Sequence, residues 1–198
     1  GIEFALETDN FTKEFKWSTS FNISFNKNKV LELGGESYKD MPEGDGHLKT
    51  GSFRRLVVGQ PIGVFYGYRF DGIFQNAEET AAQISSSSPI GIGLRRYKDL
   101  NGDKKVDATN DREIIGDSNP LFIGGFANVM SYKGFELNLF FQYSYGNDIF
   151  NYNAIELETP TGGQNAYIEL LNRWTPTNPG NIYPKASTNR AVLVSDRW

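Results

Sequence analysis

The sequence predicts a mainly β fold: an antiparallel, long-stranded sheet from a transmembrane β-barrel, present in part, with extended loops and one short helix near residues 165–174. Composition is the first observation behind this prediction. Of the 198 residues, 14% are aromatic, 21 are glycine and only 2 are methionine, which favours strands and turns over helices. The second observation is a strict alternation of apolar and polar side chains over about a dozen residues in two regions. Strands of soluble proteins are usually about 5–6 residues long, whereas a strand that crosses a bilayer needs about 9–11.

Residues 1–30 are interpreted as a pair of barrel strands. The alternation of Gly1–Thr8 predicts the first strand, and Asp9 with Asn10 predicts a short turn after it. The second strand has one apolar face and one polar face. Its apolar face consists of Phe15, Trp17, Thr19, Phe21, Ile23 and Phe25.

Residues 31–120 are predicted to be a loop region of the extracellular type, with short strands and a segment at 99–111 that resembles a calcium loop. A strand is expected at Arg54–Val58, and glycine-interrupted β-structure at residues 62–75. Asn76–Ser85 contains alanine, glutamate and glutamine, and a short helix is expected there.

Residues 121–147 predict a barrel hairpin. Phe122 begins an alternating strand that ends at Tyr132, the turn is Tyr132–Gly134, and a second alternating strand follows from Phe135 to Tyr145. Residues 148–198 are expected to be a loop with a short helix at Gln164–Trp174, which Thr175 and Pro176 end.

Charge and residue usage exclude several classes of function. The net charge of −4 gives no electrostatic footprint for nucleic acid. Cysteine is absent and His47 is the single histidine, which excludes thiolate zinc sites, cysteine nucleophiles and multi-histidine metal sites. No 18-residue apolar run and no signal peptide are present, and a first residue Gly1 instead of Met is expected of a processed or excised chain.

Five motifs follow one another along nearly the whole chain. They are Gly59–Tyr68 continuing through Asp71–Phe74, Tyr97–Asp103, Asp111–Gly116, Pro120–Phe126 and Ser131–Leu137. In this order they resemble the C-terminal barrel region of the SusC/RagA family of TonB-dependent outer-membrane transporters of Bacteroidetes. Each motif alone is weakly specific, and the specificity comes from their order.

The resemblance implies a barrel of about 22 strands around a plug domain. It also implies localisation in the outer membrane, a SusD-like lid lipoprotein as partner, and import of oligosaccharides or peptides that is driven by TonB. This sequence has neither a plug nor a TonB box and too few strands to close such a barrel. It is therefore expected to be a fragment, with the SusD-like and TonB contacts made by missing parts of the chain.

The acidic segment 99–111 has the spacing of a calcium-binding loop, with oxygen ligands at positions 1, 3, 5, 7, 9 and near 12. The candidate metal ligands are Asp99, Asn101, Asp103, Lys105 through its backbone carbonyl, Asp107 and Asp111. Two departures from the pattern are Lys104 at the usual glycine position and Asn110 at position 12. The expected cofactor is a structural Ca²⁺, and the alternative is an Asx-rich turn held by its own hydrogen bonds.

No catalytic residue is expected, and the ligand-binding residues are left unassigned. Six aromatic residues could stack on sugars but are each better explained as barrel girdle or loop core: Tyr66, Tyr68, Tyr97, Trp174, Tyr183 and Trp198. The sequence does not bring together the carboxylates Glu43, Asp45, Glu78 and Glu79 as a hydrolase would need.

Two hypotheses about function remain. In the first, the chain is a barrel segment of a nutrient importer, and its aromatic faces contact outer-membrane lipid while its polar faces line the lumen. In the second, it is a soluble secreted calcium-binding β-module that binds glycans, with the same aromatics packed between sheets. The first predicts outward-facing aromatic side chains and self-association of the isolated fragment, because its sheet edges and apolar face are unprotected.

Overall fold

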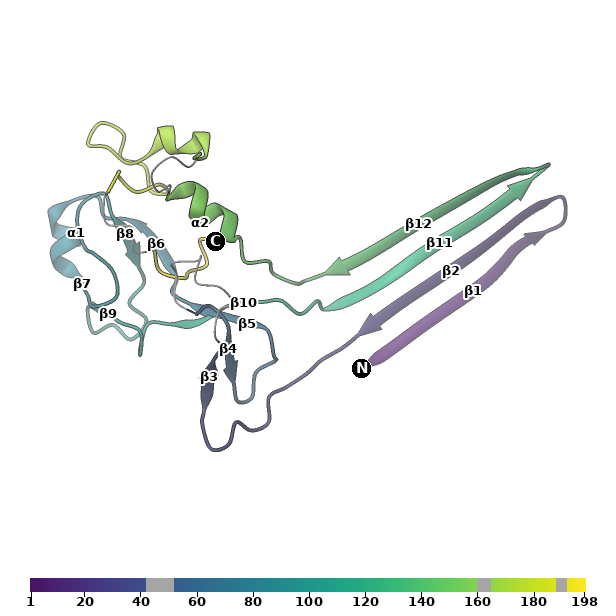
Figure 1. Cartoon of the computed structure of the whole chain (residues 1–198), viewed down its shortest axis with the longest axis horizontal. Coiled ribbons are helices and arrows are strands. Elements are labelled where there is room, and N and C mark those ends of the chain that lie inside the picture. The colour runs from purple at the N-terminus through teal and green to yellow at the C-terminus, as the bar shows by residue number, and fades with distance from the viewer. Residues whose placement is uncertain (42–51, 160–164, 188–191) are drawn as a thin grey trace.

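The computed structural model describes residues 1–41, 52–159, 165–187 and 192–198. A four-stranded antiparallel sheet projects from a separately folded region at one end of the molecule (Figure 1). The sheet contains β1 (Ile2–Thr12), β2 (Phe15–Phe25), β11 (Phe122–Tyr132) and β12 (Phe135–Tyr145), in the order β1-β2-β11-β12. We call the folded region the loop body; it consists of the described residues within 26–121 and 146–198.

The register of the sheet gathers the aromatic side chains on one face. Phe21 lies opposite Phe126 on β11, which in turn lies opposite Phe141 on β12. Directly opposed residues share a face. The pairs therefore extend one aromatic face across all four strands, and the alternate residues form a mainly polar face.

Short turns join the strands at the end of the sheet that lies away from the loop body (Figure 1). Lys133 and Gly134 connect β11 to β12 with φ angles of 46° and 85°. Two consecutive left-handed residues form the type I′ turn that matches the twist of a hairpin. The strands thus have short turns at one end and long connections at the other, the usual arrangement in outer-membrane barrels.

The expected turn at Asp9 and Asn10 is wrong, because β1 continues through Thr12 and the chain reverses at Lys13 and Glu14. The register of β1 and β2 shifts between Asp9 and Phe11, so the polar pair forms a β-bulge. The bulge brings Phe11 over Trp17, with the ring centroids 5.8 Å apart. Aromatic contact beyond the bulge explains why the strand does not end there.

The loop body is built from four two-stranded sheets: β3–β4, β5–β10, β6–β8 and β7–β9. Their strands are β3 (Tyr38–Asp40), β4 (Arg55–Val57), β5 (Val64–Gly67), β6 (Phe70–Ile73), β7 (Ile84–Ser85), β8 (Arg95–Tyr97), β9 (Lys105–Val106) and β10 (Glu113–Asp117). The strands expected at 54–58 and within 62–75 are therefore present. β3 was not expected.

Three short helices lie in the loop body. The helix expected within Asn76–Ser85 is α1 (Ala77–Ala82), capped by the side chain of Asn76. The helix expected near 165–174 is a 3₁₀ helix, η1 (Ile168–Asn172), which is short because its apolar side chains are exposed and give it no buried stripe. α2 (Tyr152–Glu158) was not expected; Asn151 caps it, and it buries Ala154 and Ile155.

The core of the molecule lies in the loop body. Ile73, Phe74 and Val64 are almost fully buried, and Tyr97 packs with Tyr68 and Val106. Residues 192–198 return to this core, where the backbone N–H of Tyr68 donates to the carbonyl of Val194 (2.8 Å). The mainly antiparallel β fold is therefore confirmed. In the described part of the chain, no helix has the length and apolar composition needed to cross a membrane.

Candidate functional site

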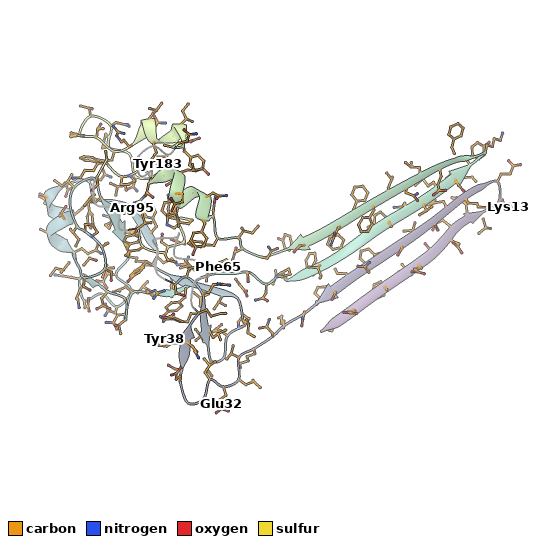
Figure 2. All side chains as sticks on the ribbon, in the orientation of Figure 1. Lys13, Glu32, Tyr38, Phe65, Arg95 and Tyr183 are labelled. Carbon is orange, nitrogen blue, oxygen red and sulfur yellow. The ribbon has the colours of Figure 1, made fainter. Side chains whose placement is uncertain are left out.

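The aromatic face of the sheet is not covered by any other described element. Leu137 and Leu139 on β12 are 50% and 39% exposed, and Phe21 and Ile23 on β2 are half-buried by their neighbours within the sheet. Figure 2 shows the side chains of the sheet extending freely from both of its faces, up to Lys13 at the far end. The packing of a second sheet or a helix against these aromatics, which a self-contained soluble module requires, is absent from the described residues.

A small polar cluster interrupts the aromatic face. Asn128 on β11 is 6% exposed, and its Oδ1 atom accepts hydrogen bonds from Trp17 Nε1 (2.8 Å) and Thr19 Oγ1 (2.9 Å). Asn10, in the β1 bulge, donates to Thr19 Oγ1 (2.7 Å). The alternation places Asn128 on this face, but sequence alone does not reveal its partners. The Asn128 amide oxygen thus has hydrogen-bond partners within the sheet. A polar group that is buried or lies in an apolar solvent needs such partners, because it cannot bond to water.

The opposite face of the sheet carries the polar residues that were expected to line a lumen. They include Ser18, Ser20, Asn22 and Ser24 on β2, and Glu136, Asn138, Gln142 and Ser144 on β12. Asn138 donates to Glu136 (2.8 Å) on this face. Three large apolar residues are exceptions on this face, namely Phe140, Ile123 and Val129, which are 68%, 47% and 41% exposed.

The acidic loop 99–111 is held by hydrogen bonds from its own backbone. Asp99 accepts from the N–H groups of Gly102 (2.7 Å) and Lys104 (2.6 Å). Asp107 accepts from Thr109 and Asn110 (both 2.9 Å), which lowers the pKa of its carboxyl. These are the bonds of the Asx-rich turn.

Asp111 ties the two ends of this loop together from a fully buried position. Its two carboxylate oxygens accept from the N–H groups of Leu100 (2.8 Å) and Asp107 (2.7 Å). Asn101 and Asp103 accept from N–H groups within the turn, and Lys105 pairs with Asp107. The loop is thus closed by the same residues that were expected to bind calcium.

The calcium hypothesis stays a prediction. Among the described residues, no three His, Cys, Asp or Glu side chains form a group that could hold a metal ion. Lys104, at the usual glycine position, nevertheless has a φ of 67°, the left-handed conformation that glycine adopts at no cost. The backbone at Lys104 therefore adopts the turn that the calcium-loop pattern requires at this position, although lysine favours that conformation less than glycine does.

The structure separates the other candidates. Tyr68, Tyr97 and Trp174 are buried and belong to the loop core, whereas Tyr66, Tyr183 and Trp198 are only half-buried. Tyr66 contacts two guanidinium groups, with Arg55 at 4.0 Å and Arg112 at 5.1 Å from its ring centroid. Cation–π contacts of this kind hold the loop body together.

The two candidate carboxylates that the structure describes, Glu78 and Glu79, both lie on α1. Glu79 accepts from Arg96 Nη1 (3.0 Å) and stabilises the start of α1, while Glu78 is exposed on the same helix. His47, Glu43 and Asp45 lie outside the residues that the structure describes.

Comparison with known proteins decides the family. No protein-family model matches the chain. However, the chain is 38% identical over 198 residues to TonB-dependent receptor P3 of Formosa agariphila, an alignment that covers 98% of this chain. It is also 24% identical to TonB-dependent receptor SusC of Bacteroides thetaiotaomicron over 76% of its length. Over most of its length, the chain is homologous to TonB-dependent receptors, SusC among them.

As a SusC-like segment, the chain spans about a fifth of its curated relatives, since the alignment covers 19% of receptor P3. The fold agrees with this relationship. A solved structure of the RagAB peptide transporter matches 96% of the chain and 20% of the transporter chain, with a TM-score of 0.66 and 20% sequence identity. The expected resemblance to a barrel fragment of this family is therefore confirmed.

Proposed function

We propose that this chain forms part of the wall and the outer loops of a TonB-dependent importer in the cell outer membrane. The observation that carries the proposal is the uncovered aromatic face of the sheet, opposite a face of serine, asparagine and glutamine side chains. An apolar band that faces lipid and a polar interior are the two surfaces of an outer-membrane barrel strand. The relatives are receptors and transporters, and this role is not enzymatic.

The imported nutrient is proposed to be a glycan or a peptide. A SusD-like surface lipoprotein would cover the outer loops, and TonB would supply the energy through parts of the receptor outside this chain. The similarity to SusC and to the RagAB peptide transporter supports these partners. The alternative, a soluble calcium-binding module that binds glycans, is less well supported because it leaves the aromatic face unexplained.

Cysteine labelling tests the orientation of the sheet, and this chain contains no cysteine of its own. In a receptor without other cysteines, Leu139→Cys and Asn138→Cys place thiols on opposite faces of one strand. In intact outer membranes, we expect a charged maleimide to modify Asn138→Cys, and only an apolar maleimide to modify Leu139→Cys. Equal reaction of both variants with the charged reagent would contradict the barrel-wall role.

Uptake tests the transport role itself. A strain without the receptor gene is grown on an oligosaccharide or a peptide as sole carbon source, with and without a plasmid copy. We expect growth on one of the two classes to require both the receptor and TonB. Growth that needs the receptor but continues without TonB would argue against energised import.

A further inference from the structure

The loop body contains a pocket that none of the relationships above assigns. Its volume is about 190 Å³, smaller than the ~300–1,000 Å³ of a site for a drug-sized ligand, and suited to a single charged group or one ring. Five segments far apart in the sequence line it: residues 88–89, β8 with the residue before it, the C-terminal end of α2, η1 with the residue after it, and residues 184–187. Figure 2 places Arg95 and Tyr183 in this part of the loop body, far from Lys13 at the tip of the sheet.

The lining of the pocket is cationic, although the chain as a whole carries a net charge of −4. Arg95, Arg173 and Lys185 contribute three positive charges, and Glu158 contributes the only carboxylate of the lining. Glu158 already accepts two hydrogen bonds from Arg197 Nη2 (2.8 and 3.0 Å). Its charge is therefore committed to another residue.

Of the three cations of the pocket, Arg95 is the one with a buried donor atom that has no hydrogen-bond partner. Its Nη2 atom is buried and has no hydrogen-bond partner, and no carboxylate of the described residues lies within ion-pair distance of it. The sequence stretches 160–164 and 188–191, which follow the lining residues Thr159 and Ser187 in the chain, contain no aspartate or glutamate. A buried charge without a partner is costly, and burial lowers the pKa of the Arg95 guanidinium.

The surroundings of Arg95 hold it in place, and the attraction between its charge and Glu158 is opposed by the nearby charge of Arg197. Its Cζ atom lies 5.3 Å from the ring centroid of Trp198, which also contacts Arg197 at 5.1 Å. The N–H of Lys185 donates to the carbonyl of Gly93 (2.8 Å), so the wall of residues 184–187 is fixed beside β8. A β-carbon at Gly93 would lie 2.5 Å from Trp174, which shows how closely these segments pack.

We propose that this pocket binds a carboxylate group of a ligand, with Arg95 as its principal partner and Arg173 and Lys185 at its sides. A guanidinium group can donate two parallel hydrogen bonds to a carboxylate. The apolar walls Leu94, Leu170 and Pro184 suit the carbon skeleton of the ligand. Inorganic phosphate has no carbon skeleton to pack against these walls, which favours an organic carboxylate.

Two sources supply such a group: an acidic saccharide and the C-terminus of a peptide. The probes are glucuronate with glucose as its neutral counterpart, and acetyl-alanine with its amide. Binding to the purified full-length receptor is measured by calorimetry, which requires no transport. The receptor could therefore bind the carboxylate without importing the nutrient, or import the nutrient without binding the carboxylate, and the two measurements distinguish these outcomes.

We expect saturable binding of glucuronate or acetyl-alanine, with no binding of the neutral counterparts. Arg95→Gln should weaken that binding roughly 10-fold or more, because a charge-assisted hydrogen bond is lost. Arg96→Gln is the matched control: Arg96 is the next residue of β8, but it pairs with Glu79 and Asp71 outside the pocket. It should change affinity less than about 2-fold.

A stability measurement separates a ligand site from a structural role. Arg95→Gln removes an unpaired buried charge, so the melting temperature of the ligand-free receptor should not fall. If the variant does not fold, Arg173→Gln at the exposed rim should still reduce binding about 3-fold. The proposal is overturned if neither carboxylate saturates up to about 10 mM. It is equally overturned if the neutral probes or inorganic phosphate bind as tightly, or if Arg95→Gln folds and binds like the wild type.

Discussion

The sheet and the loop body use aromatic side chains in opposite ways. On the sheet, Phe141 is 58% exposed although it lies in a regular eleven-residue strand. In the loop body, Phe65 and Tyr97 are only 8% and 2% exposed, although their strands are four and three residues long. The loop body therefore has a core of its own, whereas the sheet depends on surroundings that the described residues do not provide.

This difference shows that strand regularity and burial are separate properties. The long strands gain their order from backbone pairing and from aromatic contacts across strands. The loop body has short, irregular pairs, and side-chain packing and ion pairs hold it together. Five predictions test the contrast, beginning with the largest expected effect.

Removal from its surroundings should change the sheet most. In β1 and β12 the outer backbone edges are unpaired, and one face of the sheet is aromatic. We expect the 198-residue chain, purified without detergent, to form oligomers. Size-exclusion chromatography with light scattering measures this, and a stable monomer would contradict the contrast.

A core substitution should affect only the loop body. Phe74→Ala should destabilise the loop body by about 3–5 kcal/mol, because it leaves a cavity. Leu171→Ala, at an 81% exposed position of η1, should cost less than about 0.5 kcal/mol. Hydrogen exchange on the receptor measures both, and equal effects would show that the loop body lacks a real core.

A charge should be tolerated on only one face of the sheet. Leu139→Arg, near the middle of β12, should destabilise the barrel by about 2–4 kcal/mol if that face contacts the bilayer centre. Asn138→Arg, one residue away on the polar face, is the control. The amount of folded receptor in outer-membrane fractions measures the effect, and identical yields would argue against lipid contact.

The acidic loop allows a smaller test. Lys104→Gly should stabilise the loop by about 1 kcal/mol, because glycine has no β-carbon and adopts the left-handed conformation of this position without steric cost. It should also strengthen calcium binding, since glycine is the usual residue at that position. Thermal melting with and without calcium measures both effects. If neither the wild-type receptor nor Lys104→Gly binds calcium at millimolar concentration, the calcium hypothesis is wrong and the loop is a hydrogen-bonded Asx-rich turn.

The smallest effect concerns pH. Burial raises the pKa of Glu158, and the charges of Arg197 and Arg95 partly offset this. A raised pKa in the folded state means that this group's contribution to stability is complete below the ordinary glutamate pKa. The contribution is then lost as pH rises through the raised value. The melting temperature of wild type should fall relative to Glu158→Gln over that range; a constant difference would contradict the shift.

The long strands could be predicted because alternation is a local signal that persists over many residues. The bulge at Asp9 and Asn10 could not, since the same two residues favour a turn and only the contact between Phe11 and Trp17 decides otherwise. α2 has seven residues and buries one narrow face, which is too little periodicity to recognise.

The acidic loop was found because its oxygen-bearing residues follow one another in sequence. The pocket around Arg95 was not, because its walls come from five separate segments and no spacing connects them. Asn128 illustrates the same limit: its partner Trp17 is 111 residues away. Sequence patterns indicate the structure of a single segment, whereas contacts between residues far apart in the sequence are seen only in the folded structure.

The return of residues 192–198 to Tyr68 has a consequence for biogenesis. The hairpin of β11 and β12 lies in the chain between the two halves of the loop body that this contact joins. The outer loops therefore cannot adopt their final structure until the whole hairpin and the segment after it have been synthesised and delivered. In the order of synthesis, the hairpin therefore comes first and the segment that completes the loop body comes last.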